Sequence, residues 1–113
     1  MNAWTWLLQR ISAFVLLIVL GLHILFLHFA HGGDVLHYSE IIKRLGTPVF
    51  ITLDILLLIF GLYHALYGVY AVFLDFGFGL KTRVVVLCLL IVAGMSFMGF
   101  GIYGFWAFIG SNA

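Results

Sequence analysis

The sequence predicts an all-α integral membrane protein with three transmembrane helices and a short amphipathic interfacial helix. The chain has 113 residues, of which 65% are hydrophobic and 8% are charged. A soluble domain is typically about 45–50% apolar and about 25% charged. Three apolar stretches, at approximately residues 11–30, 49–74 and 84–109, each have the length of about 20 residues that crosses a bilayer. The whole chain, 1–113, is expected to form a single membrane-anchor domain.

Composition also narrows the classes of function. The formal net charge of +1 provides no basic surface for a nucleic acid. Cys88 has no second cysteine with which to form a disulfide or a cysteine-based metal site. The first apolar stretch is longer than the core of a signal peptide, so cleavage is not expected. No nucleophile–base pair, phosphate loop or paired carboxylates are present, which argues against a self-contained catalytic centre.

The first span, 11–30, follows Trp4, Trp6 and Arg10, residue types that gather at a membrane interface. Basic residues at the ends of the spans favour an N-terminus in the cytoplasm by the positive-inside rule. Three basic residues would lie on the cytoplasmic side of the membrane, Arg10, Lys81 and Arg83, and two on the opposite side, Lys43 and Arg44.

Residues 34–46 carry apolar side chains at helical spacing with charged residues between them, which predicts a short helix on the membrane surface. Asp34 is expected to cap this helix and Gly46 to end it. Thr47 and Pro48 then start the second span, with a hydroxyl at the cap and proline in the first turn.

The third span follows a short polar connection, residues 75–83. Four of its glycines, small enough to let a neighbouring helix approach closely, are Gly94, Gly99, Gly101 and Gly104.

His64, inside the second span, is the first candidate for chemistry. Ionisable side chains within a span are costly and mark functional sites. On a helix, this imidazole shares one narrow face with Asp75 and with four small residues: Gly61, Ala65, Gly68 and Ala71. Such a face leaves room for a flat group such as haem, for which imidazole is a usual axial ligand. It equally allows a neighbouring helix to pack closely, with His64 hydrogen-bonded across the contact. The face alone does not choose between the two.

The other polar residues of the spans have simpler expected roles. His23, taken alone, is interpreted as a hydrogen-bond donor between helices. His28 and His31, near the end of the first span, are interpreted as solvated or headgroup contacts. Asp54 is expected to make an interhelical hydrogen bond, in preference to relaying protons.

Two stretches of the chain resemble a known family. Residues 6–13, W-L-L-Q-R-I-S-A, resemble the W-x-x-x-R-[IV]-[ST]-[AG] start of the small hydrophobic anchor subunit of succinate dehydrogenase, respiratory complex II. Residues 63–76 resemble that family's second span, with H-x-x-x-G and then D-[YF] seven residues after the glycine. The likeness in length and in the three-span layout covers almost the whole chain.

The resemblance implies that His64 is an axial ligand of haem b, opposite a histidine of a second anchor subunit. Residues 23–30 resemble H-x-x-x-x-H-F-A of the two-haem members, which implies that His23 is a further ligand. The depths of His23 and His64 in the membrane differ by about 12 Å when they are counted from the loop between the first two spans. They differ by about 3 Å when they are counted from Arg10 and Asp75 at the other surface. Val69 and Tyr70 depart from members that have an arginine here for a haem propionate, so the partner subunit is one possible source of that contact.

Arg10 and Asp75 lie at one surface, where they can pair or hold a quinone headgroup with water. With Ser12 they are the residues that the resemblance implies for the quinone site. Phe76 departs from the tyrosine that many members use to bond quinone, which argues against a direct role for this position. Two-haem members commonly work with menaquinone, which is slightly favoured here.

The resemblance thus implies an anchor that holds an iron–sulfur subunit and a flavoprotein subunit at the inner (cytoplasmic) membrane. The chain would pass electrons from the iron–sulfur subunit to quinone, within membrane lipid and beside a second anchor subunit. Alternatives are the anchor of a quinol:fumarate reductase and a cofactor-free structural subunit of another membrane complex. A proton-coupled transporter that uses Asp54 and His64 is disfavoured, because the two are about 80° apart on the helix with about 15 Å of rise between them.

Overall fold

The computed structural model describes residues 2–29 and 37–111, and all its regular structure is helical. The elements are α1 (Ala3–Ile24), a π-helical turn η1 (Leu25–Phe29), α2 (Tyr38–Leu45), α3 (Pro48–Asp75) and α4 (Leu80–Ser111). Three stretches are long and apolar enough to cross a membrane, namely Ala3–Phe29, Pro48–Asp75 and Leu80–Gly110. The predicted fold class is therefore confirmed.

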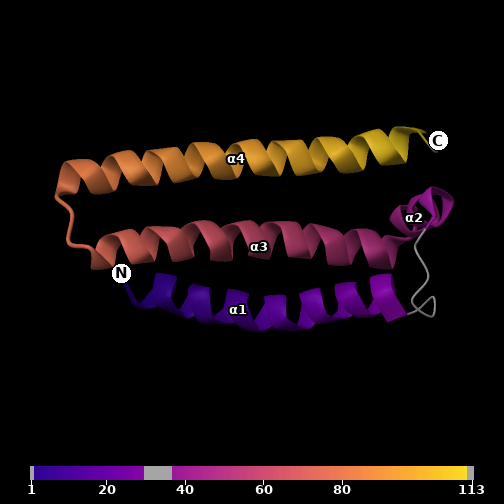
Figure 1. The fold of residues 1–113 in the computed structure, drawn as a ribbon, viewed down its shortest axis with the longest axis horizontal. Coiled ribbons are helices and arrows are strands. Elements are labelled where there is room, and N and C mark those ends of the chain that lie inside the picture. Colours follow the sequence, from indigo (N-terminus) through magenta and orange to yellow (C-terminus); the bar gives the residue numbers. More distant parts are fainter. Residues whose placement is uncertain (1, 30–36, 112–113) are drawn as a thin grey trace.

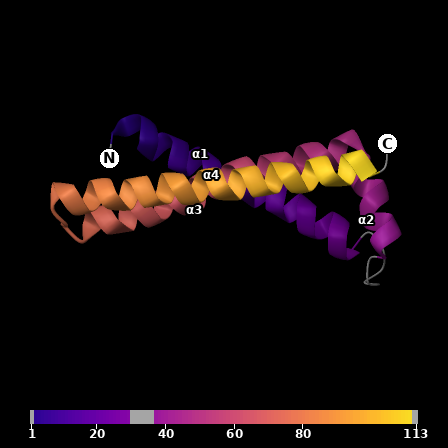
Figure 2. The ribbon, with the colours of Figure 1, turned by 90° about the horizontal axis from the view of Figure 1, so that it is seen from above.

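Helix α3 is the centre of the molecule. It packs against α1 on one side and α4 on the other (Figure 1). Seen from above, α1 crosses the other two helices obliquely, while α3 and α4 run nearly along one another (Figure 2). Among the described residues only Val19 and Ser12 are buried. Most of the apolar surface therefore faces outward, as expected of helices surrounded by lipid or by other subunits.

Helix α1 begins earlier than the span predicted from hydropathy, because Asn2 caps it. The Oδ1 atom of Asn2 accepts a hydrogen bond of 2.9 Å from the backbone N–H of Thr5. This contact satisfies one of the free N–H groups of the first turn. The interfacial residues are thus helical, and the Arg10 guanidinium lies 5.2 Å from the centre of the Trp6 ring, one turn away. This is a cation–π contact.

The connection between α2 and α3 follows the sequence closely. Gly46 is the C-cap of α2, Thr47 the N-cap of α3 and Pro48 its first residue, all as predicted. The Thr47 hydroxyl does not cap α3, however, because it donates to the carbonyl oxygen of Lys43 at 3.1 Å. Asp34, the predicted cap of the amphipathic helix, lies outside the described residues, and α2 begins after residue 37.

Two of the four glycines singled out in the third span bring α4 against α3. A Cβ atom on Gly94 would lie 2.6 Å from Leu66, and one on Gly101 would lie 2.7 Å from Leu58. Both distances are shorter than real contacts, so the side chain of Leu66 or of Leu58 would have to move. At the other two glycines, Gly99 and Gly104, a Cβ atom would meet nothing within 4 Å.

The substitution Gly101→Val is expected to loosen the packing of α4 on α3. The methyl carbons of Leu58 would lie 2.7 and 3.1 Å from the new Cβ and its Cγ atom 3.5 Å away, so the whole Leu58 side chain would have to move. Overpacking of this kind costs about 1–3 kcal/mol. The measurement is the thermal unfolding midpoint of the purified protein in detergent, with Gly99→Val as the matched control. Equal midpoints for the two variants would contradict the assignment.

Candidate functional site

The polar contact between α1 and α3 is centred on His64. The Oγ atom of Ser12 lies 2.8 Å from the carbonyl oxygen of Gln9 and 3.1 Å from Nδ1 of His64. A hydroxyl has one proton to donate, and a carbonyl oxygen only accepts. The Ser12 hydroxyl therefore donates to the Gln9 carbonyl and accepts from Nδ1–H of His64. In the neutral ring this arrangement leaves the lone pair on Nε2, the nitrogen that is free to bind a ligand.

Gln9 strengthens the same contact. Its Nε2 atom donates to the backbone carbonyl oxygen of His64 at 3.2 Å. The amide lies over Gly68, since a Cβ atom there would lie 3.4 Å from the amide nitrogen. A Cβ on Gly61 would likewise lie 3.9 Å from Leu16. At these two positions the small residues beside His64 are thus covered by α1, and His64 is hydrogen-bonded across the contact.

A second histidine, His23, pairs with Asp54 farther along the interface between α1 and α3. Nδ1 of His23 on α1 lies 3.1 Å from Oδ1 of Asp54 on α3, and both side chains are half-buried. The interhelical hydrogen bond expected of Asp54 is present, and its partner is the histidine that was interpreted as a donor. Asp54 precedes His64 by ten residues, so the two imidazoles lie at levels about 15 Å apart along α3. The structure supports the larger of the two depth differences obtained from the sequence.

A small cavity of about 170 Å³ lies beside His23 at the end of the bundle where α2 crosses. Arg44 of α2 reaches it, donating to the carbonyl oxygen of Phe26 and stacking 5.0 Å from the centre of the Phe50 ring. The cavity thus has an imidazole, a carboxyl group and a guanidinium in an otherwise apolar wall. Its lining is His23, Phe26, Leu27, Ile41, Arg44, Leu45, Phe50, Leu53 and Asp54.

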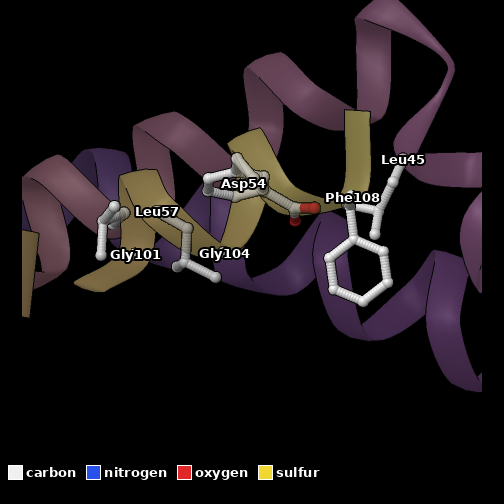
Figure 3. Close-up of a pocket in the computed structure, with 8 residues that line it drawn as sticks. Leu45, Asp54, Leu57, Gly101, Gly104 and Phe108 are labelled. Carbon is white, nitrogen blue, oxygen red and sulfur yellow. The ribbon is translucent and has the colours of Figure 1, made fainter. Parts of the chain in front are cut away.

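Asp54 also borders an apolar cavity of about 450 Å³ between α3 and α4. Figure 3 shows its carboxyl group pointing toward the end of this cavity where Phe108 and Leu45 lie. The opposite end is formed around Leu57 and two glycines of α4. The carboxyl group is therefore held in largely apolar surroundings, where a hydrogen bond is electrostatically stronger than in water.

The three residues assigned to a quinone site are not brought together as one cluster. Ser12 is 1% exposed and is engaged with His64, so its hydroxyl is closed to an outside group. Asp75 is exposed at the C-terminal end of α3, and Arg10 is exposed in the N-terminal part of α1. No ion pair joins them in the described part of the chain.

His28 takes no part in the contacts described for this interface. His28 is exposed within η1, and His31 lies outside the described residues. Across residues 2–29 and 37–111, no group of three or more His, Cys, Asp or Glu side chains is placed to hold a metal ion. His64 and His23 are each hydrogen-bonded at Nδ1 by a side chain of the neighbouring helix.

Arg44 and Gln9 are the members of this interface that the sequence did not identify. Arg44 was counted only among the basic residues that set the orientation and among the charged residues of the amphipathic helix. The structure places it, together with Leu45, in the wall of the His23 cavity. Gln9 stands inside the W-L-L-Q-R-I-S-A stretch, three residues before Ser12, which places it one turn away on the same face.

Comparison with known proteins gives consistent results. Residues 1–103 match the family of succinate dehydrogenase/fumarate reductase transmembrane subunits. The chain is 30% identical over 98 residues to the succinate dehydrogenase hydrophobic membrane anchor subunit of Archaeoglobus fulgidus. The matched region covers 87% of this chain and 83% of that protein. No solved structure matches the chain.

Proposed function

The chain belongs to the family of succinate dehydrogenase/fumarate reductase transmembrane subunits, and on this premise we propose that it binds haem b and passes electrons to quinone. As a membrane anchor of a succinate/fumarate oxidoreductase, it would hold an iron–sulfur subunit and a flavoprotein subunit at the membrane beside a second anchor subunit. Succinate oxidation would take place in the flavoprotein, and this chain would contribute the membrane anchor.

The observation that carries the haem proposal is the hydrogen bond between Ser12 and His64. An axial histidine must present an unprotonated nitrogen to iron while its other ring nitrogen is held by a neighbouring acceptor. His64 meets both conditions, since Nδ1 is bonded at 3.1 Å and the ring is only half-buried. The opposite axial ligand would come from the partner anchor, on the side of α3 that α1 leaves uncovered.

His23 is proposed as the ligand of a second haem b. Its ring is half-buried and its Nδ1 is held by Asp54, as the Nδ1 of His64 is held by Ser12. The difference in depth between the two histidines suits two haems placed one after the other across the membrane. Arg44, which lines the cavity beside His23, has the positive charge that a haem propionate requires. It would take the place of the arginine that the second span lacks at Val69 and Tyr70.

Bound haem would supply a site for one electron at a time in the low dielectric of the membrane. The residues of this chain hold the ring nitrogens, exclude water and fix the spacing between the two sites. Arg10 and Asp75 are proposed to contact the quinone headgroup, slightly favoured to be menaquinone, at the end of the bundle near the α3–α4 connection. Ser12 would support that region indirectly, through its bond to His64.

The location proposed for the chain is the inner (cytoplasmic) membrane, with the N-terminus in the cytoplasm. This orientation would place Arg10 and Asp75 on the cytoplasmic side, near a soluble iron–sulfur subunit. The same geometry serves a quinol:fumarate reductase, because the direction of electron flow follows the quinone potential and the soluble subunits.

The experiment that tests the proposal is the amount of haem b per flavin in the complex purified through this subunit. A reduced-minus-oxidised spectrum measures the haem, and a redox titration counts its components. Two components with separate midpoints are expected. Flavin without haem would reject the proposal in favour of an anchor that lacks cofactors, and the absence of both would mean a structural subunit of another complex.

A further inference from the structure

The two histidines differ in the group that holds Nδ1, and this difference has a chemical consequence. The acceptor at His64 is the Ser12 hydroxyl at 3.1 Å, whereas the acceptor at His23 is the Asp54 carboxyl group at 3.1 Å. A carboxyl oxygen is a stronger acceptor than a hydroxyl that is already engaged, and a hydrogen bond to an ionised carboxylate is roughly twice as strong as a neutral one. The distances are equal, so the chemistry of the acceptor is what separates the two sites.

We infer that Asp54 is a positioning residue that orients His23 and lowers the reduction potential of the haem which that histidine binds. The inference rests on the proposed function, since it assumes that His23 is an axial ligand. Asp54 would not touch the haem itself. It would act through Nδ1, as the carboxylate partners of metal-bound histidines do when they fix the ring and raise its basicity.

The sign of the expected change in reduction potential follows from which oxidation state of the iron a more basic ligand stabilises. A more basic imidazole donates more electron density and so stabilises ferric iron relative to ferrous iron, which lowers the potential. The surroundings of Asp54 strengthen the bond, because the residue lies between two cavities whose walls are mainly apolar. Arg44 shares one of these cavities. Removing the carboxylate would leave that positive charge less compensated, which raises the potential in the same direction.

Both contacts join α1 to α3, so a role in packing alone has to be distinguished from a role toward haem. A packing role predicts a loss of stability that is indifferent to which haem is measured. A positioning role predicts a shift confined to one of the two redox components. The two contacts lie about 15 Å apart along α3, so each can be changed without touching the other.

The test is a redox titration of the haems in the purified complex that carries Asp54→Asn, a variant of almost unchanged size. We expect the midpoint of one component to rise and the other to stay at its wild-type value. The component that moves should be the one missing from His23→Ala. The matched variant Ser12→Ala should show the reverse pattern, raising only the component that is missing from His64→Ala.

Asp54→Glu is a second variant for the case in which Asp54→Asn does not assemble. It keeps the carboxyl group but displaces it by one methylene, so we expect the same midpoint to rise less far. Unchanged midpoints in the variant that assembles, or a shift of the His64 component, would overturn the inference while leaving haem binding in place. A wild-type complex with a single haem that survives His23→Ala would overturn it as well. A wild-type complex without haem would instead reject the proposed function.

Discussion

Replacing His64 by alanine is expected to remove one haem b per flavin from the purified complex. The substitution deletes the nitrogen proposed to bind iron, and it also leaves the buried Ser12 hydroxyl without its donor. The measurement is the reduced-minus-oxidised spectrum, scaled to flavin, together with electron transfer from succinate to quinone. We expect the haem signal to fall and quinone reduction to slow, while succinate oxidation by a soluble artificial acceptor continues.

His28→Ala is the matched control for this variant. It removes an imidazole of the same size from the same subunit, but from an exposed position on η1 that contacts neither His64 nor Ser12. The haem content should therefore equal that of the wild-type complex. If His64→Ala retained the full haem content, His64 would be a packing histidine and the ligand assignment would fail.

The second large effect is expected from His23→Ala, which should remove the other haem and leave the first. The loss would appear as one missing component in the redox titration, with the remaining midpoint close to its wild-type value. The reason is distance, because the His23–Asp54 pair lies about 15 Å along α3 from His64. A titration that kept both components would return His23 to the role of an interhelical donor.

The sequence was sufficient for the architecture because the bilayer sets the length of an apolar span. Three such spans predicted three helices, and Gly46, Thr47 and Pro48 marked the boundary between two elements correctly. The start of α1 was missed, since a hydropathy pattern detects the apolar part of a helix and not its interfacial first turns. Asn2, an N-cap followed by a threonine that donates back to it, was the available signal.

The candidate site was predicted in its residues but not in its contacts. The small residues around His64 are equally suited to a cofactor and to a helix, and only the register of α1 against α3 places Leu16 and Gln9 over Gly61 and Gly68. The pairing of His23 with Asp54 depends on the same register. It cannot be read from spacing within either helix, because it sets one helix against another that runs in the opposite direction.

The glycines of α4 illustrate the same limit. Four of them suggested a close helix contact, but the sequence does not say which face of the helix meets α3. The structure selects Gly94 and Gly101, which are seven residues apart and so lie on one face. Gly99 has open space where a Cβ atom would be.

The central claim is that each of two histidines presents Nε2 to a haem iron while its Nδ1 is held by the neighbouring helix. A cryo-electron microscopy map of the intact complex would test it most directly. The account predicts haem density at Nε2 of His64 and at Nε2 of His23, with Ser12 and Asp54 still at hydrogen-bond distance from the two Nδ1 atoms. Protein or lipid density against both Nε2 atoms, with no haem beside α3, would contradict it.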